Sequence, residues 1–186
     1  MRKEIRVLGI DDSPFDRQKG KNVLVVGTFF RGGSFMDGLL STYIRKDGVN
    51  STRNLVEMVN RSKFKTQIRA LLLNGIAVGG FNVIDIQRLN RLTKIPVIVV
   101  MRNFPDKPKM FKALRKMKQE FKIKLIEKAG EIHKVGKICI QISGISLGEA
   151  KEIIDITTTY ADIPEPLRIA HLTASGIIKG ESSGQA

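Results

Sequence analysis

The chain has 186 residues, of which 42% are hydrophobic, and its formal net charge is +14. This length and apolar content suit a single domain over residues 1–186 with its own core. One cysteine, Cys139, excludes an internal disulfide, and no apolar stretch approaches the length of a membrane span. We therefore expect a cytoplasmic protein without a membrane partner, and the positive charge predicts attraction to a polyanion such as nucleic acid.

The first 45 residues predict three strands joined as an antiparallel meander. Apolar, β-branched and aromatic runs are separated by the polar loop 11–21 and by a turn at Gly32-Gly33. Asp47-Gly48 is a strong reversal signal after the third strand. The expected strands cover residues 3–10, 23–30 and 35–45.

From residue 50 the pattern changes to alternating helices and strands. Apolar residues at helical spacing predict helices, and short, wholly apolar runs predict strands that are buried on both faces. The expected helices cover residues 52–62, 83–92, 107–121, 146–157 and 167–178. The expected strands cover residues 68–73 and 96–101, followed by a hairpin over 132–142. Polar residues 179–186 predict a flexible tail.

This order predicts an α/β fold with a mixed sheet flanked by helices. A three-strand antiparallel meander followed by parallel strands is the pattern of the ribonuclease H-like fold. That fold places acidic residues at the ends of its first and fourth strands.

The ends of two predicted strands carry the first candidate site. Asp11 and Asp12 follow the first strand, and Asn74 follows the fourth. The carboxyl ends of neighbouring parallel strands meet at one edge of a sheet, where ligands bind. Carboxylate and amide oxygens suit Mg²⁺, so we expect these three residues to hold it, weakly because Asn74 brings no charge. The alternative is a pair of acidic residues that cap a turn.

Other residues are candidates on weaker patterns. Asp47 either forms the Asp-Gly turn or supplies a further catalytic carboxylate. Arg168 and His171 are three residues apart on a predicted helix, so they share a face that suits an anion or a metal. A glycine-rich loop could bring backbone amides close to a ligand. It lacks the Lys and Ser or Thr of a phosphate-binding loop, so no nucleotide cofactor is expected. The loop candidates are Gly75, Gly79, Gly80, Phe81 and Asn82.

The predicted helix over 107–121 has a strongly basic face. Such a face either tracks a phosphate backbone or is simply solvated. The low aromatic content, 6%, argues against stacking on single-stranded bases. The basic candidates are Lys107, Lys109, Lys112, Arg115 and Lys116, with Arg168 added from the last helix.

Three segments together resemble a known family. They are Gly9-Ile10-Asp11-Asp12, the stretch from Leu71 to Asn82, and Ile163-Pro164-Glu165-Pro166-Leu167-Arg168-Ile169-Ala170-His171. They resemble the archaeal domain-of-unknown-function family 99, which is itself similar to endonuclease V, of the ribonuclease H-like fold. The resemblance implies phosphodiester cleavage near inosine, with Mg²⁺ held by acidic residues. By position, Asp11 matches the first acidic ligand, Asn74 stands at the second, and His171 falls in the motif near the metal.

The sequence departs from the endonuclease V pattern at several points. Asn74 removes a carboxylate, and the intervening catalytic Glu has no counterpart that Asp37 or Asp47 replaces fully. Phe15 stands in the region of a Tyr that forms part of a strand-separating wedge. Two interpretations therefore stay open: a metal-dependent nuclease, or a nuclease-derived nucleic-acid-binding protein with an eroded acidic site. A protein-interaction module is the further alternative, and the oligomeric state is not specified by the sequence.

Overall fold

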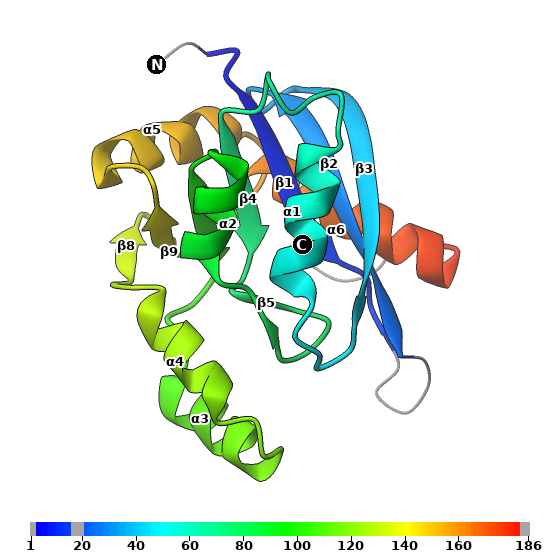
Figure 1. The fold of residues 1–186 in the computed structure, drawn as a ribbon. Coiled ribbons are helices and arrows are strands. Elements are labelled where there is room, and N and C mark those ends of the chain that lie inside the picture. Colours follow the sequence, from blue (N-terminus) through cyan, green and yellow to red (C-terminus); the bar gives the residue numbers. More distant parts are fainter. Residues whose placement is uncertain (1–2, 16–20, 183–186) are drawn as a thin grey trace.

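The computed structural model describes residues 3–15 and 21–182 (Figure 1). Its main sheet has the strand order β3-β2-β1-β4-β7-β9-β8, and β5 and β6 form a small separate hairpin. The strands are β1 (Arg6–Asp12), β2 (Asn22–Arg31), β3 (Phe35–Arg45), β4 (Ala70–Asn74), β5 (Ala77–Val78), β6 (Asn82–Val83), β7 (Val97–Met101), β8 (His133–Val135) and β9 (Ile138–Ser143). The helices are α1 (Ser51–Asn60), α2 (Ile86–Thr93), α3 (Lys107–Lys116), α4 (Phe121–Lys128), α5 (Leu147–Thr157) and α6 (Glu165–Lys179).

The expected mixed sheet is confirmed. Strand β2 pairs antiparallel with both β1 and β3, which is the predicted meander. Strands β1, β4 and β7 pair in parallel, so their carboxyl ends meet at one edge. Strand β1 extends to Asp12, so both carboxylates belong to the strand and not to the following loop as the sequence suggested.

Helices cover both faces of the sheet, because side chains alternate along each strand. On one face, Leu8 and Leu71 pack with Leu55 of α1 and with α2. On the other face, Leu72 packs with Ile153 of α5 and with the start of α6. A strand buried on both faces must be apolar throughout, which explains the continuous apolar run of β4.

The single helix predicted over 107–121 is wrong. Helix α3 ends at Lys116, and a second helix, α4, begins at Phe121. Lys118 has a left-handed φ of 55°, while the amides of Lys118 and Gln119 donate to the carbonyls of Arg115 and Leu114. This is a Schellman ending with a lysine at the position that glycine usually occupies, so the sequence carried no stop signal.

Other boundaries shift for local reasons. Helix α2 begins at Ile86 and not at residue 83, because Asp85 is its N-cap and accepts a hydrogen bond from the Arg88 amide. Helix α6 begins at Glu165 and ends at Lys179, so the expected tail starts one residue later. Residues 183–186 of that tail, and 16–20 of the expected loop 11–21, lie outside the described residues. Within the described ranges, no helix is both long and apolar enough to cross a membrane.

Candidate metal and nucleic-acid site

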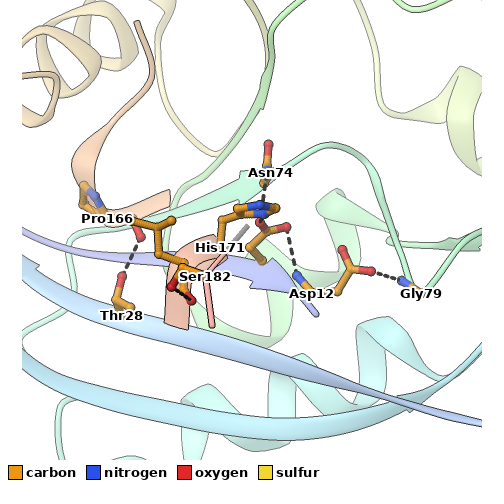
Figure 2. Close-up of polar contacts among 9 residues, drawn as sticks. Asp12, Thr28, Asn74, Gly79, Pro166, His171 and Ser182 are labelled. Carbon is orange, nitrogen blue, oxygen red and sulfur yellow. Dashed lines mark hydrogen bonds and ion pairs between the residues drawn. The ribbon is translucent and has the colours of Figure 1, made fainter. Parts of the chain in front are cut away.

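Asp11 is the centre of the candidate site. It lies at the carboxyl end of β1, in the middle of the sheet, and is only 3% exposed. Its Oδ2 atom is 3.0 Å from Nδ2 of Asn74 and 2.9 Å from Nδ1 of His171. Its Oδ1 atom accepts the amide of Asp12. The structure therefore brings together residues from β1, β4 and α6, and the close-up in Figure 2 shows Asn74 and His171 converging there.

Asp12 is the second carboxylate of the site. Its Oδ2 atom accepts a hydrogen bond from the amide of Gly79 at 2.8 Å (Figure 2). Burial disfavours the charged carboxylate and the neighbouring Asp11 repels it, which together raise the pKa of Asp12 to about 6. A bound cation would reduce the repulsion between these two adjacent carboxylates and would favour the ionised form of Asp12.

The position of His171 depends on how closely α6 approaches β1. A Cβ atom added at Gly9 would lie 2.4 Å from the carbonyl carbon of Pro166, so only glycine fits there. The buried hydroxyl of Thr28 donates to the Pro166 carbonyl at 2.6 Å (Figure 2). These contacts anchor the first turn of α6 and place His171, five residues further along, at Asp11.

Arg168 and Glu165 complete the start of α6. Glu165 is 3% exposed, and its Oε2 atom is 2.7 Å from Nη2 of Arg168. A buried carboxylate requires such a partner, because an unpaired buried charge is costly. The structure thus gives Arg168 a structural contact within the Pro-Glu-Pro-Leu-Arg segment, and its predicted contact with nucleic acid stays a prediction.

Asp47 contacts the glycine-rich loop. Its Oδ1 atom accepts the amide of Phe81 at 2.8 Å, and its own amide donates to the carbonyl of Gly79. Gly80 has a φ of +82°, and a Cβ atom there would lie 2.3 Å from the same Oδ1 atom. Asp47 therefore holds the loop that in turn donates to Asp12.

Asn82, like Asp47, connects segments of the chain through hydrogen bonds. It is fully buried, donates from Nδ2 to the carbonyl of Arg45 and accepts the amide of Ser51. These bonds tie the β5–β6 hairpin to the turn that follows β3 and to the start of α1.

An open groove of about 570 Å³ lies at the carboxyl edge of the parallel strands. Of the glycine-rich loop candidates, Gly75 lines this groove, whereas Gly79, Gly80, Phe81 and Asn82 are not among its lining residues. Arg102 is a lining residue that sequence reasoning missed, although a basic residue directly after a buried strand was the available signal. The groove is lined by Asp11, Asp12, Ser13, Pro14, Phe15, Asn74, Gly75, Val100, Met101, Arg102 and His171.

The donor set fits a weakly held magnesium-type ion better than a closed metal site. Within the two described ranges, no three His, Cys, Asp or Glu side chains gather as a metal-binding group. Mg²⁺ is commonly bound by one or two carboxylates together with water and substrate phosphates. Asp11 and Asp12 meet that requirement, and a turned amide of Asn74 would add a neutral oxygen.

Solved structures with a similar fold include endonucleases V and one archaeal protein. The chain resembles a protein of unknown function from Archaeoglobus fulgidus with a TM-score of 0.88 and 46% identity, over 94% of this chain and 99% of that one. It resembles Ciona intestinalis endonuclease V, solved with inosine-containing DNA, with a TM-score of 0.63 and 15% identity, over 94% of this chain and 86% of that one. Human ENDOV gives a TM-score of 0.60 at 19% identity, over 94% and 84%. The fold is therefore the ribonuclease H-like fold of endonuclease V.

Sequence comparison defines the family. The chain is 47% identical to a UPF0215 protein of Methanothermobacter thermautotrophicus, over 100% of this chain and 94% of that protein. It is 48% identical to a UPF0215 protein of Archaeoglobus fulgidus, over 99% of both. The profile of the family described as Endonuclease dU matches residues 3–178. The chain belongs to this Endonuclease dU family.

Proposed function

We propose that this protein is a metal-assisted endonuclease that cleaves a nucleic-acid strand containing a deaminated base, with deoxyuridine as the first candidate. The observation that carries the proposal is the convergence of Asp11, Asp12, Asn74 and His171 in an open groove at the carboxyl edge of the sheet. The description of the family supports deoxyuridine, and the inosine-containing DNA bound to Ciona intestinalis endonuclease V supports deaminated bases in general.

Each side chain of the site has a distinct role in this proposal. Asp11 and Asp12, with the amide oxygen of Asn74, would hold Mg²⁺. The ion would polarise a phosphoryl oxygen and lower the pKa of a bound water. His171 orients Asp11 through its Nδ1 contact and, because it lines the groove, can also carry a proton to or from a reacting oxygen. Arg102 at the same groove offers positive charge to a phosphate.

The second candidate is a nucleic-acid-binding protein that does not cleave. The observation in its favour is the donor set, because Asn74 brings no charge and, in the described part of the chain, no three His, Cys, Asp or Glu side chains gather as a metal-binding group. In this case Asp11 would serve the structure of the groove and the basic surface would supply the affinity. A protein-interaction role, the third alternative, predicts no salt-sensitive binding to nucleic acid.

A strand-cleavage assay separates these functions. Labelled single- and double-stranded oligonucleotides carrying one deoxyuridine, one inosine or neither are incubated with the protein in Mg²⁺, in Mn²⁺ and in EDTA. We expect metal-dependent cleavage of the deoxyuridine strand that Asp11→Asn reduces at least about 100-fold. Asp162→Asn, an exposed carboxylate paired with Lys137, is the matched control and should cleave normally. Binding without cleavage, unchanged by Asp11→Asn, would establish the second candidate instead.

A further inference from the structure

An exposed aromatic ring stands beside the groove. Phe104 is 67% exposed and lies two residues beyond Arg102, which lines the groove. Two residues span at most about 7 Å, so the backbone of Phe104 is within reach of a nucleic-acid strand bound in the groove. Exposed apolar side chains are common on protein surfaces, and position is therefore what must distinguish this one.

The backbone that follows Phe104 is fixed by the start of α3. Asp106 is the N-cap of α3 and accepts the amide of Lys109 at 2.9 Å. Pro105 restricts the preceding backbone, and its carbonyl accepts the amide of Lys107. The chain segment that carries the exposed ring therefore leads directly into a capped helix.

Two other exposed phenylalanine rings each have a cationic partner. Phe35 lies under the guanidinium of Arg31 at 5.3 Å, and Phe121 lies 5.9 Å from the ammonium of Lys122. Among the described residues, the structure shows no aromatic or cationic partner for the ring of Phe104. Its face is therefore open to a flat ligand.

Beyond Phe104 the chain continues into a strongly basic segment. Residues 107–128, which we call the basic arm, hold nine basic and two acidic residues, a net charge of +7 that is half of the whole chain's +14. Their helices α3 and α4 extend from the body at the lower left of Figure 1. Lys109, Lys112, Arg115 and Lys116 are all exposed on α3. This surface complements a phosphate backbone.

The basic arm is fixed to the body by a buried lysine. Lys122 is 1% exposed, and its Nζ atom donates to the carbonyls of Asp47 and Phe81 and to Oε1 of Gln119, at 2.6 to 2.7 Å. Phe81 lies on the loop that donates to Asp12 through Gly79, and Asp47 holds that loop through the Phe81 amide. The arm and the groove are thus held in a defined relation, with Phe104 on the segment that joins them.

We propose that Phe104 is a base-stacking platform for single-stranded nucleic acid, which passes from the groove over this ring onto the basic arm. An unpaired base would stack on the ring while its phosphates meet the lysines of α3. This inference rests on the proposed function for the groove and deepens it, because it names an unpaired strand as the substrate class. The low overall aromatic content does not oppose it, since one well-placed ring suffices for one base.

Fluorescence tests the stacking directly, because the native chain contains no tryptophan. Phe104→Trp and Tyr160→Trp each create a protein with one tryptophan, and Tyr160 is a matched exposed site that lies outside both the groove and the basic arm. Each is titrated in EDTA with a 12-nucleotide deoxythymidine strand and, separately, with inorganic polyphosphate. We expect saturable quenching by at least half at position 104 with the oligonucleotide, little quenching there with polyphosphate, and no change at position 160.

Affinity provides the second measurement. Phe104→Ala should weaken binding of the same strand roughly 5- to 150-fold, whereas Phe104→Trp should retain it, as expected for loss of one stacked base. Equal quenching by polyphosphate, no quenching by the strand, or a Phe104→Ala affinity within twofold of the native value would each overturn the inference.

The two proposals fail in different ways. Cleavage of the deoxyuridine strand in Mg²⁺ without quenching at position 104 would overturn the stacking inference and leave the proposed function intact. Quenching at position 104 without cleavage under any metal would support the stacking platform and overturn the proposed endonuclease.

Discussion

Nδ1 of His171 lies 2.9 Å from Oδ2 of Asp11, although the two residues are 160 positions apart in the chain. The contact exists because β1 and α6 pack unusually closely, with Gly9 directly beneath Pro166. A helix that carries a candidate catalytic histidine is thus positioned by a residue that has no side chain. The predictions below test this packing, the site that it creates and the basic arm beside it.

Gly9→Ala should damage both stability and the site. Its Cβ atom would approach three Pro166 atoms to within 2.6 Å, so α6 must shift. We expect a loss of about 3 kcal/mol in the free energy of unfolding, measured by urea denaturation. Gly148→Ala is the control, because a Cβ atom there meets nothing within 4 Å in α5. It should stabilise the protein by about 0.5–1 kcal/mol. Equal effects of the two substitutions would contradict the packing argument.

Asp12→Asn should stabilise the protein at neutral pH. The pKa of Asp12 is raised from 3.8 to about 6. Between about pH 4 and pH 6, Asp12 is therefore protonated in the folded protein but ionised in the unfolded chain. The contribution of Asp12 to the free energy of unfolding is therefore most favourable below about pH 4, is lost as the pH rises through 6, and is least favourable above pH 7. Asparagine avoids this loss and can still accept the Gly79 amide.

The size and pH window of this effect make it measurable. Urea unfolding at pH 4, 5.5 and 7.5 should show Asp12→Asn gaining up to about 3 kcal/mol over the native protein at pH 7.5 and little at pH 4. A gain that does not depend on pH would show that the ionisation of Asp12 is not its cause.

Divalent cations should stabilise the native protein through the same carboxylates. A free cation concentration 100-fold above its Kd adds about 2.7 kcal/mol to the free energy of unfolding, which corresponds to a rise of about 5–10 °C in Tm. The measurement is a thermal unfolding series in Mg²⁺ and Mn²⁺. Asp11→Asn should lose the shift and Asp162→Asn should keep it. A shift that persists in Asp11→Asn would place the ion elsewhere.

Lys122→Met should loosen the link between the basic arm and the body. It leaves the partly buried carbonyl of Phe81 without the lysine as donor, whereas the carbonyl of Asp47 keeps Nε2 of Gln119, and one unsatisfied group costs about 1–3 kcal/mol. We expect a net loss of about 1–3 kcal/mol on urea denaturation, with faster hydrogen exchange at the Phe81 amide. Lys124→Met, an exposed lysine on the same helix, should change stability by less than about 0.5 kcal/mol.

The exposed charges of α3 should set the salt dependence of single-strand binding. Each phosphate contact contributes about 0.7 to the slope of log affinity against log salt concentration. Replacing Lys109, Lys112 and Arg115 together by alanine should therefore reduce that slope by about 2. The matched control removes three exposed lysines outside the arm: Lys63, Lys94 and Lys151. A control that reduces the slope equally would show that total charge, and not the arm, governs binding.

Much of the fold could be predicted from local sequence alone. Apolar runs such as β4 and Asp-Gly turns such as Asp47-Gly48 act over a few residues, so the meander and the parallel strands were recognisable. The end of α3 was not, because Lys118 adopts a backbone conformation that is typical of glycine. Helix α4 alternates apolar and basic residues near its start, a pattern without the usual helical spacing.

The candidate site also has features that the sequence predicts and features that only the tertiary structure shows. The sequence by itself predicted that Asp11, Asp12 and Asn74 follow apolar strands, and the order of strands and helices favoured a sheet in which those strands are neighbours. Only the tertiary structure decided that Asp11 contacts His171, that Asp47 holds a loop, and that Lys122 is buried. Those contacts join residues 34 to 160 positions apart, and they depend on close packing that no local pattern encodes.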